Sequence, residues 1–429
     1  MFLIGLATNP LFLFVAVWST VVALYAAGVS VDLFPFPHPL TIRVLLLNGI
    51  AFPLGYLTWI LLKGLTPQDE DRPAFLSRPA TPERIQWALA FTLLAGAAAS
   101  GLMLYRASLI ADHFRMTVAD LFARPALLRF GLVMFVEASV SHSSWIVQMI
   151  SLTSALFAVG FVLLGVFLYL DRTVRKYAFL CVFLLMGLAI CLMNLSRYDM
   201  TVYVLYVIFS YGVVCVSAGE KRFRRVVKDL LLPVLTVVVI FTVVELLLRK
   251  RGTYGCTTTA GGILYSFYWY LASPTAALNE FLTDFPGAFD LGQNTFLPFW
   301  KWLNRFGLLP APEVSAYGEY VFIPYPANVY TYLRPFYEDF GIWGVAVLPY
   351  LLGGFLAVLK GPAGRHVSCL YLYVTLLVPI LFSFFSYPLL SSQFYIQIAF
   401  AFLLFRYDLR AVRRVDPANV AADAIWAGA

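Results

Sequence analysis

Ten stretches of mostly apolar residues constrain the fold of this chain more than any other feature. A helix needs roughly 20 such residues to cross the hydrocarbon core of a bilayer. Only 12% of the 429 residues are charged, about half the supply of a soluble protein, so the chain cannot cover a water-facing surface. We therefore expect an all-α polytopic membrane protein with about ten transmembrane helices, at residues 9–29, 42–62, 86–104, 147–170, 177–194, 201–218, 229–248, 340–359, 367–386 and 391–405. The first stretch follows no basic segment, so it is expected as a span and not as a removed signal peptide.

The loops between these spans differ in charge. One alternating set holds 18 of the 30 Lys and Arg residues, and it comprises residues 63–84, 171–176, 219–228, 360–366 and the tail from 406. Loops rich in Lys and Arg stay in the cytoplasm, so both termini are expected there. The net charge of +7 then reflects these loops, and nucleic acid is not expected as a partner.

The same reasoning divides the chain into four parts. Residues 1–248 hold spans one to seven with an external segment at about 105–146, and residues 249–338 form a large extracytoplasmic loop. Residues 339–405 hold the last three spans, and 406–429 form a cytoplasmic tail. The large loop contains "GGILYSFYWYLASPTAALNEFL" and "FLPFWKWLNRFGLL", which have the period of amphipathic helices lying at the membrane interface. Its many aromatic residues fit either a belt at headgroup depth or surfaces on which sugar rings stack.

Four separate regions each place an arginine at the external side: Arg129, Arg197, Arg251 and Arg334. A guanidinium group binds phosphate oxygens through two parallel hydrogen bonds and keeps its charge at any relevant pH. The four arginines therefore favour a lipid-linked phosphate or diphosphate as ligand. Two alternatives remain at this point, which are attraction to anionic lipid headgroups and, at the neighbouring Arg249 and Lys250, snorkelling to the membrane surface.

Acidic groups at the same side are candidates for accepting a proton from a sugar hydroxyl. They include Glu137, Glu338 and Asp339, and His142 is a further candidate base. Asp339 has an alternative interpretation as a helix N-cap, because it directly precedes an apolar run. The sequence has no pair of His at metal-ligand spacing and no Gly-rich nucleotide loop, so neither a metal nor a cofactor is expected.

Three segments resemble the family of O-antigen polymerase-type oligosaccharide repeat-unit polymerases. The most specific is "NVYTYLRPFYEDFGIWG" at residues 328–344. The others are "YWYLASPTAALNEFL" followed by "NTFLPFWKWLNRFG", and the turn "NLSRYDM". The similarity covers roughly residues 170–390. One departure is Tyr198, which stands where the family often has a small residue, so this turn is expected to differ in shape.

The resemblance implies a GT-C-like, metal-independent glycosyltransferase at the periplasmic face of the bacterial inner membrane. Such enzymes join oligosaccharide units carried on undecaprenyl diphosphate into O-antigen, capsule or exopolysaccharide, and a chain-length regulator membrane protein is an expected partner. By motif match, Arg334 and Arg197 would grip the diphosphate, and Asp339 or Glu338 would act on the acceptor. Further substrate-binding candidates are Arg251, Arg129, Asn328, Tyr330, Thr331, Tyr337, Glu137 and His142.

Other functions also remain open at this stage. An O-antigen ligase would use the same chemistry on a different acceptor. A flippase or other transporter of lipid-linked oligosaccharides would need charges and breaks inside the spans. A structural scaffold for the assembly machinery would not need arginines from four regions.

Overall fold

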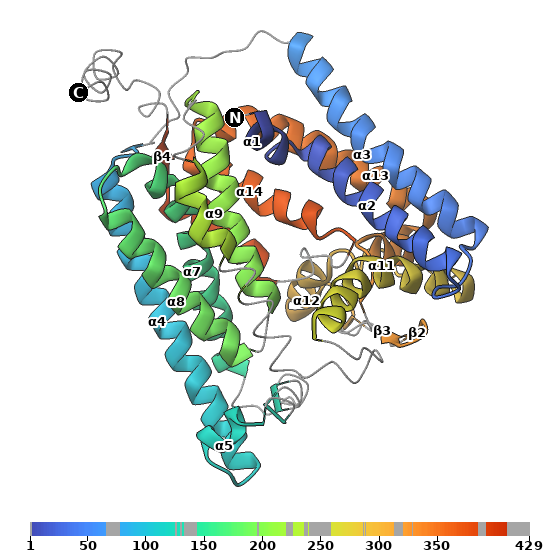
Figure 1. Ribbon diagram of the computed structural model, residues 1–429, viewed down its shortest axis with the longest axis horizontal. Helices are drawn as coiled ribbons and strands as arrows, with labels where there is room; N and C mark the ends of the chain where they lie inside the picture. Colours follow the sequence, from blue (N-terminus) through green and yellow to red (C-terminus); the bar gives the residue numbers. More distant parts are fainter. Residues whose placement is uncertain are drawn as a thin grey trace.

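The computed structural model describes residues 2–65, 78–124, 127–128, 131–132, 144–194, 197–219, 226–235, 239, 259–285, 287, 289–312, 321–327, 329–384 and 392–409. These residues form a predominantly helical protein, as expected (Figure 1). Seven of the described helices are long and apolar enough to cross a membrane. They are α2 (Pro10–Ser30), α3 (Pro39–Leu65), α4 (Pro82–His113), α7 (Ser144–Leu170), α8 (Arg175–Asn194), α9 (Arg197–Ser217) and α13 (Leu333–Ala363).

The seven long helices confirm the class of membrane protein, whereas the number of ten spans stays a prediction. Two further expected spans correspond to shorter apolar helices, α14 (Val367–Leu381) and α15 (Ser392–Leu404). The expected span 229–248 lies mostly outside the described residues. The described residues 226–235, which include its start, are helical. A short helix, α1 (Phe2–Ala7), precedes α2, and another, α5 (Val118–Phe122), follows α4.

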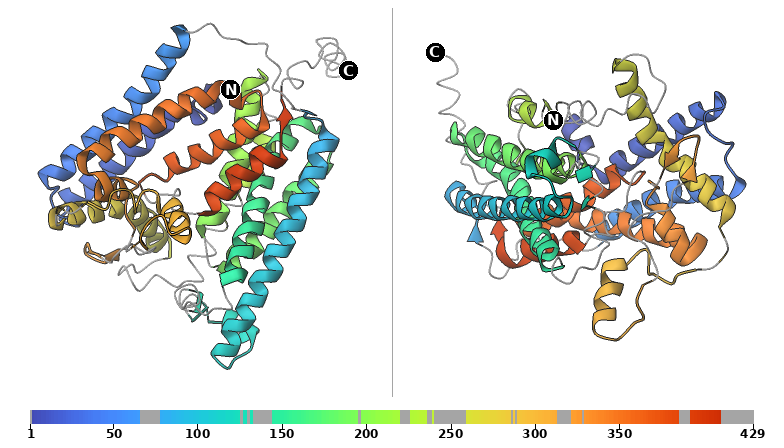
Figure 2. Two further views of the ribbon diagram at one scale, coloured as in Figure 1. Left: turned by 180° about the vertical axis from the view of Figure 1, so that it is seen from behind. Right: turned by 90° about the horizontal axis from the view of Figure 1, so that it is seen from below.

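The long helices form two groups that diverge toward one end of the molecule, with α14 between them (Figures 1 and 2). In one group α7 packs between α4, α8 and α9, and aromatic rings fill its core. The Phe157 ring stacks on Phe183 with 5.5 Å between centroids, and the Phe161 ring stacks on Tyr203 at 4.6 Å. In the other group α13 packs along α3, with α2 beside them. Gly353 permits this close approach, because a Cβ there would lie 2.3 Å from the Phe52 carbonyl oxygen.

Residues from three separate loops meet at one end of the helices. Strand β1 (Arg78–Pro79) pairs in parallel with β4 (Tyr407–Asp408), and His366 forms a bridge to Asp408. The Leu409 amide also donates to the Arg365 carbonyl at 2.7 Å. The sequence placed these three loops on one side of the membrane, and the pairing brings them together as that prediction requires. That this end faces the cytoplasm stays a prediction.

The opposite end carries the segment expected as a large external loop. It contains α11 (Thr259–Asp284), α12 (Leu297–Arg305) and a hairpin of β2 (Val321–Phe322) with β3 (Pro326–Ala327). The two stretches predicted as amphipathic helices are thus confirmed as helical. Asn279 fixes α11 against the start of α3, because its Oδ1 accepts hydrogen bonds from the His38 amide at 2.7 Å and the Thr41 hydroxyl at 2.8 Å.

Helix α13 contains a sharp kink that the sequence did not predict. Gly341 has φ 58° and ψ −143°, a conformation that is accessible almost only to glycine. Gly344 and Phe336 are eight residues apart, which in a straight helix would separate them by about 12 Å. Here a Cβ at Gly344 would lie 2.1 Å from the Phe336 carbonyl oxygen. The two parts of α13 therefore lie against each other. We call residues 333–340 the re-entrant helix, and the domain boundary expected at residue 338 falls inside it.

The re-entrant helix begins deep among the long helices. The Tyr332 hydroxyl donates to Asn48 Oδ1 in the middle of α3 at 2.6 Å, and the Tyr332 ring lies 5.9 Å from Trp18 in the middle of α2. The Tyr332 amide donates to the Ser383 carbonyl at 2.8 Å. Irregular backbone at membrane depth is tolerated only where it is buried in protein or lines a cavity. These contacts satisfy that condition, because the start of the helix is buried against α2 and α3.

Candidate functional site

Arg334, in the first turn of the re-entrant helix, is the centre of the candidate site. Its guanidinium carbon lies 4.0 Å from the centroid of the Tyr330 ring and 4.8 Å from that of Phe281 in α11. A cation over an aromatic face is attracted by the ring quadrupole, more strongly when water is excluded. Arg334 Nε also donates to Glu338 Oε1 at 2.8 Å, and each of the two side chains is 15% exposed. The guanidinium is thereby held in one orientation by two rings and one carboxylate.

One edge of the Arg334 guanidinium is not satisfied by the protein. Nη1 is buried and has no hydrogen-bond partner among the described residues. Buried polar groups are usually paired, and an unsatisfied one costs about 1–3 kcal/mol, or more when it is charged. The site therefore presents a pre-oriented cationic donor to which an anionic acceptor can bind.

Asp339, the next acidic residue, has a structural role in this arrangement. It is 0% exposed, and its Oδ1 accepts from the Asn294 amide at 3.0 Å and from Asn294 Nδ2 at 3.2 Å. Its Oδ2 accepts from the Thr295 amide. The first part of α13 begins at Leu333 and the second follows the non-helical Gly341. Asp339 accepts from Asn294 and Thr295, so the alternative interpretation as a helix N-cap was wrong. Asp339 binds instead the turn that precedes α12.

Further bonds join that turn to the re-entrant helix. The Asp290 amide donates to the Glu338 carbonyl at 3.1 Å, and the Asp290 carboxylate accepts from Asn294 Nδ2 at 2.8 Å. The Thr295 hydroxyl donates to the Pro335 carbonyl at 3.2 Å. The turn and the helix thus form one unit, in which Glu338 is the acidic side chain that reaches Arg334.

Three other predicted site residues lie in or next to this unit. Tyr330 is 8% exposed and packs on Arg334. Thr331 is 1% exposed, and its hydroxyl accepts from the Leu333 amide at 3.3 Å, so it stabilises the turn that leads into the re-entrant helix. Tyr337 is 9% exposed, and its ring lies 5.3 Å from Phe285. Because Thr331 and Tyr337 are buried, we expect them to stabilise the re-entrant helix rather than to contact a ligand.

The remaining predicted residues are not brought to this site by the described structure. Arg197 is the first residue of α9, which belongs to the other group of helices, and its side chain is not described. Five predicted residues lie outside the described part of the chain: Arg129, Glu137, His142, Arg251 and Asn328. Their proposed roles stay predictions.

Sequence reasoning missed two residues that shape the site. Phe281 packs on the Arg334 guanidinium, and Asn294 binds Asp339 across 45 positions of the sequence. Both contacts join residues that are far apart in the sequence. For the fold-back at Gly341 the sequence offers one signal, a glycine two residues after an acidic pair.

The site offers no grouped metal ligands in the described residues. No three His, Cys, Asp or Glu side chains of that part of the chain lie together in a way that would hold a metal ion. That the reaction needs no metal stays a prediction from the sequence.

Comparisons with known proteins add no family assignment, because no protein-family model, no curated protein and no solved structure matches the chain. The argument for function therefore depends on the residues of the site.

Proposed function

We propose that this protein is a glycosyltransferase that polymerises oligosaccharide units carried on undecaprenyl diphosphate into a surface polysaccharide. The observation that supports this most is the half-buried Arg334 side chain, whose buried Nη1 lacks an acceptor among the described residues while Nε is paired with Glu338. The resemblance of residues 328–344 to repeat-unit polymerases supplies the reaction type. The proposed location is the periplasmic face of the bacterial inner membrane, with a chain-length regulator as an expected partner.

In this proposal Arg334 binds the lipid diphosphate. Its Nε is engaged by Glu338, so the terminal nitrogens are the atoms that face the ligand. The start of the re-entrant helix adds the partial positive charge of a helix N-terminus, which favours an anion. The rings of Tyr330 and Phe281 fix the guanidinium plane and so reduce the entropy lost on binding.

The proposed reaction joins the growing chain to a new unit. An acceptor hydroxyl oxygen forms a bond to the anomeric carbon of the growing chain, and the bond from that carbon to the diphosphate oxygen breaks. The leaving diphosphate takes the electron pair, and its charge is stabilised by Arg334, as pre-oriented donors stabilise developing charge in other enzymes. The hydroxyl proton passes to a carboxylate.

Glu338 suits the role of proton acceptor better than Asp339. Glu338 is 15% exposed, and its Oε2 has no hydrogen bond to a described residue. Both oxygens of Asp339 are occupied by Asn294 and Thr295. We therefore propose Glu338 as general base and Asp339 as the residue that positions the turn beneath it.

One observation favours a second candidate function, transport of a lipid-linked oligosaccharide. Discontinuous helices whose N-termini point at an anionic substrate are typical of transporters, and the re-entrant helix has this form. An O-antigen ligase would use the same diphosphate contacts as the polymerase but a different acceptor.

The test is polymerisation in vitro by purified protein in nanodiscs, supplied with one lipid-linked repeat unit and no added metal. We expect a ladder of products from the wild type and none from Arg334→Ala. Arg305→Ala, a change at an exposed arginine of α12, is the matched control and should give the wild-type ladder. A ladder from Arg334→Ala at the wild-type rate would exclude the proposed site. Movement of the intact unit across a liposome membrane without a new glycosidic bond would favour the transporter.

A further inference from the structure

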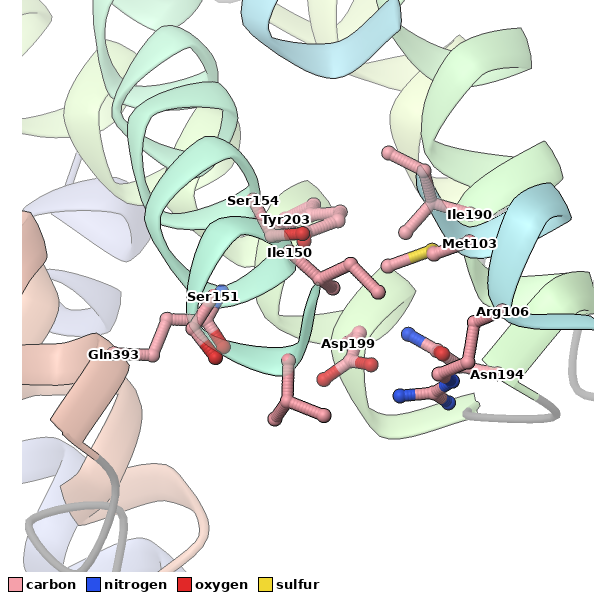
Figure 3. A pocket seen from close by; sticks show the side chains of 11 residues that line it. Met103, Arg106, Ile150, Ser151, Ser154, Ile190, Asn194, Asp199, Tyr203 and Gln393 are labelled. Carbon is pink, nitrogen blue, oxygen red and sulfur yellow. The ribbon is translucent and has the colours of Figure 1, made fainter. Parts of the chain in front are cut away.

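A polar pocket lies between α4, α7, α8, α9 and the start of α15, toward the end of α4 that leads to α5 (Figure 3). Its volume is about 170 Å³. That is many times the roughly 10–15 Å³ that one water molecule needs, and it is below the roughly 300 Å³ at which sites for drug-sized ligands begin. The pocket therefore has room for one small group rather than for an extended ligand.

The lining of this pocket is rich in hydrogen-bonding side chains. Arg106 and Asn194 lie beside each other, and Asp199 points into the same space from the first turn of α9 (Figure 3). Ser151 and Ser154 of α7 supply hydroxyl groups, and the Ser154 hydroxyl is buried without a hydrogen-bond partner among the described residues. Because buried hydroxyls are normally paired, this atom indicates a polar ligand.

The charge of the lining separates this pocket from the Arg334 site. Its charged members are one cation, Arg106, and one anion, Asp199, and its other polar members are neutral. A diphosphate would meet the carboxylate of Asp199 and be repelled. A neutral polyhydroxyl compound offers donors to the carboxylate and acceptors to the guanidinium, and its CH groups can contact Tyr203, which is 4% exposed.

We infer that this pocket binds a single neutral sugar ring through its hydroxyl groups. Arg106 donates to one hydroxyl, Asp199 accepts from another, and the Ser154 hydroxyl pairs with a third. The inference rests on the proposed function in so far as the sugar belongs to a lipid-linked unit. It adds a saccharide subsite on the group of helices that does not carry Arg334.

The experiment uses the full-length protein in nanodiscs and saturation-transfer NMR. The probes are free glucose, galactose, N-acetylglucosamine and rhamnose, with inorganic pyrophosphate as competitor. We expect at least one sugar to bind the wild type and pyrophosphate not to displace it. Ser154→Leu fills the pocket, and Asp199→Asn removes a charged hydrogen-bond acceptor. Each variant should weaken sugar binding about tenfold or more, which is the effect of losing one hydrogen bond to a charged group. Ser108→Leu, two residues from Arg106 in α4 and outside the lining, is the matched control and should bind as the wild type.

Three results would overturn the inference: no binding of any of the four sugars, equal binding by wild type and Asp199→Asn, or displacement of the sugar by pyrophosphate. Asp199→Asn carries the test if Ser154→Leu does not fold. The Arg334→Ala variant separates this inference from the proposed function, because it should lose polymerisation and keep sugar binding. Sugar binding by a wild type that forms no polymer would refute the proposed function alone. Polymerisation by a wild type that binds none of the sugars would refute this inference alone.

Discussion

Two ion pairs at different places in this protein differ in burial and in how completely their charges are paired. Lys176 Nζ lies 2.7 Å from Asp229 Oδ1 and also donates to the Leu168 carbonyl at 3.3 Å. Asp229 further accepts from the hydroxyls of Tyr177 at 2.7 Å and Tyr211 at 2.9 Å. The Arg334–Glu338 pair has one hydrogen bond, and Arg334 Nη1 has no partner in the described part of the chain.

The difference separates a structural pair from one that is available to a ligand. Burying two charges costs several kcal/mol per ion unless further hydrogen bonds satisfy the remaining donors and acceptors. The protein supplies those bonds to Lys176 and Asp229. It leaves Arg334 with an unused donor, which is the state expected of a binding group before its anion arrives.

The largest expected effect is on the free energy of unfolding, at the Lys176–Asp229 pair. Lys176→Met leaves Asp229 buried at 1% exposure without its counter-charge, which should cost about 3–5 kcal/mol. Thermal unfolding of the purified protein measures this loss. The double variant Lys176→Met with Asp229→Leu should recover most of it, because an apolar pair replaces the two charges. If Lys176→Met unfolded at the wild-type temperature, the Lys176–Asp229 pair would contribute no more to stability than the Arg334–Glu338 pair, and the comparison would fail.

A smaller effect, on the rate of polymer formation, is expected at the Arg334–Glu338 pair. Glu338→Gln removes the proposed general base and should lower the rate of polymer formation about 100-fold. The comparison variant is Asp339→Asn, in which an amide group faces the Asn294 and Thr295 backbone donors. We expect this second change to lower thermal stability by about 1–3 kcal/mol. If Glu338→Gln kept the full rate and Asp339→Asn were stable but inactive, Asp339 would be the general base and Glu338 would not.

The kink at Gly341, which follows the Arg334–Glu338 pair in α13, should tolerate no side chain. At Gly341→Ala the new Cβ would lie 2.9 Å from the Phe289 ring in a conformation that costs about 1–3 kcal/mol for other residues. Unfolding and polymerisation assays should both show a loss. Gly101→Ala is the control, because no atom lies within 4 Å of its Cβ position in α4, and it should be neutral or stabilising. Equal behaviour of the two variants would remove the argument for the fold-back.

The smallest effect is expected on stability at Arg334 itself. Arg334→Met removes an i,i+4 pair whose members retain some exposure, and such pairs contribute about 0.3–0.5 kcal/mol. It also removes a donor that the protein does not satisfy. Calorimetry should therefore give a loss of about 1 kcal/mol or less, far below that of Lys176→Met. A loss as large as in Lys176→Met would identify Arg334 as a structural residue.

Much of the helical framework could be predicted because apolar length is a local property. The stretch expected at 9–29 became α2, Pro10–Ser30, and the stretch at 177–194 became α8, Arg175–Asn194. Each of these spans was predicted from the residues within it. The pair of Arg334 and Glu338 was not predicted, because residues four apart share a face only within a helix and the apolar run indicated a helix only from residue 340.

The rest of the site depends on contacts that no local pattern encodes. The apolar run suggested a helix from residue 340, but the helix begins at Leu333 and folds back at Gly341. Asp339 then reaches Asn294 and Thr295, and Arg334 reaches Phe281. These partners are far away in the sequence, so their types alone could not identify them.

The most direct test of the central claim is whether Arg334 recognises a diphosphate. Native mass spectrometry of the purified protein gives the dissociation constants of undecaprenyl diphosphate and of undecaprenol, which differ only in the charged group. We predict that the wild type prefers the diphosphate by about 10-fold to 100-fold, the effect of charge-assisted hydrogen bonds from one guanidinium. Arg334→Ala should abolish the preference, and Arg305→Ala should keep it. An unchanged preference in Arg334→Ala would contradict the claim.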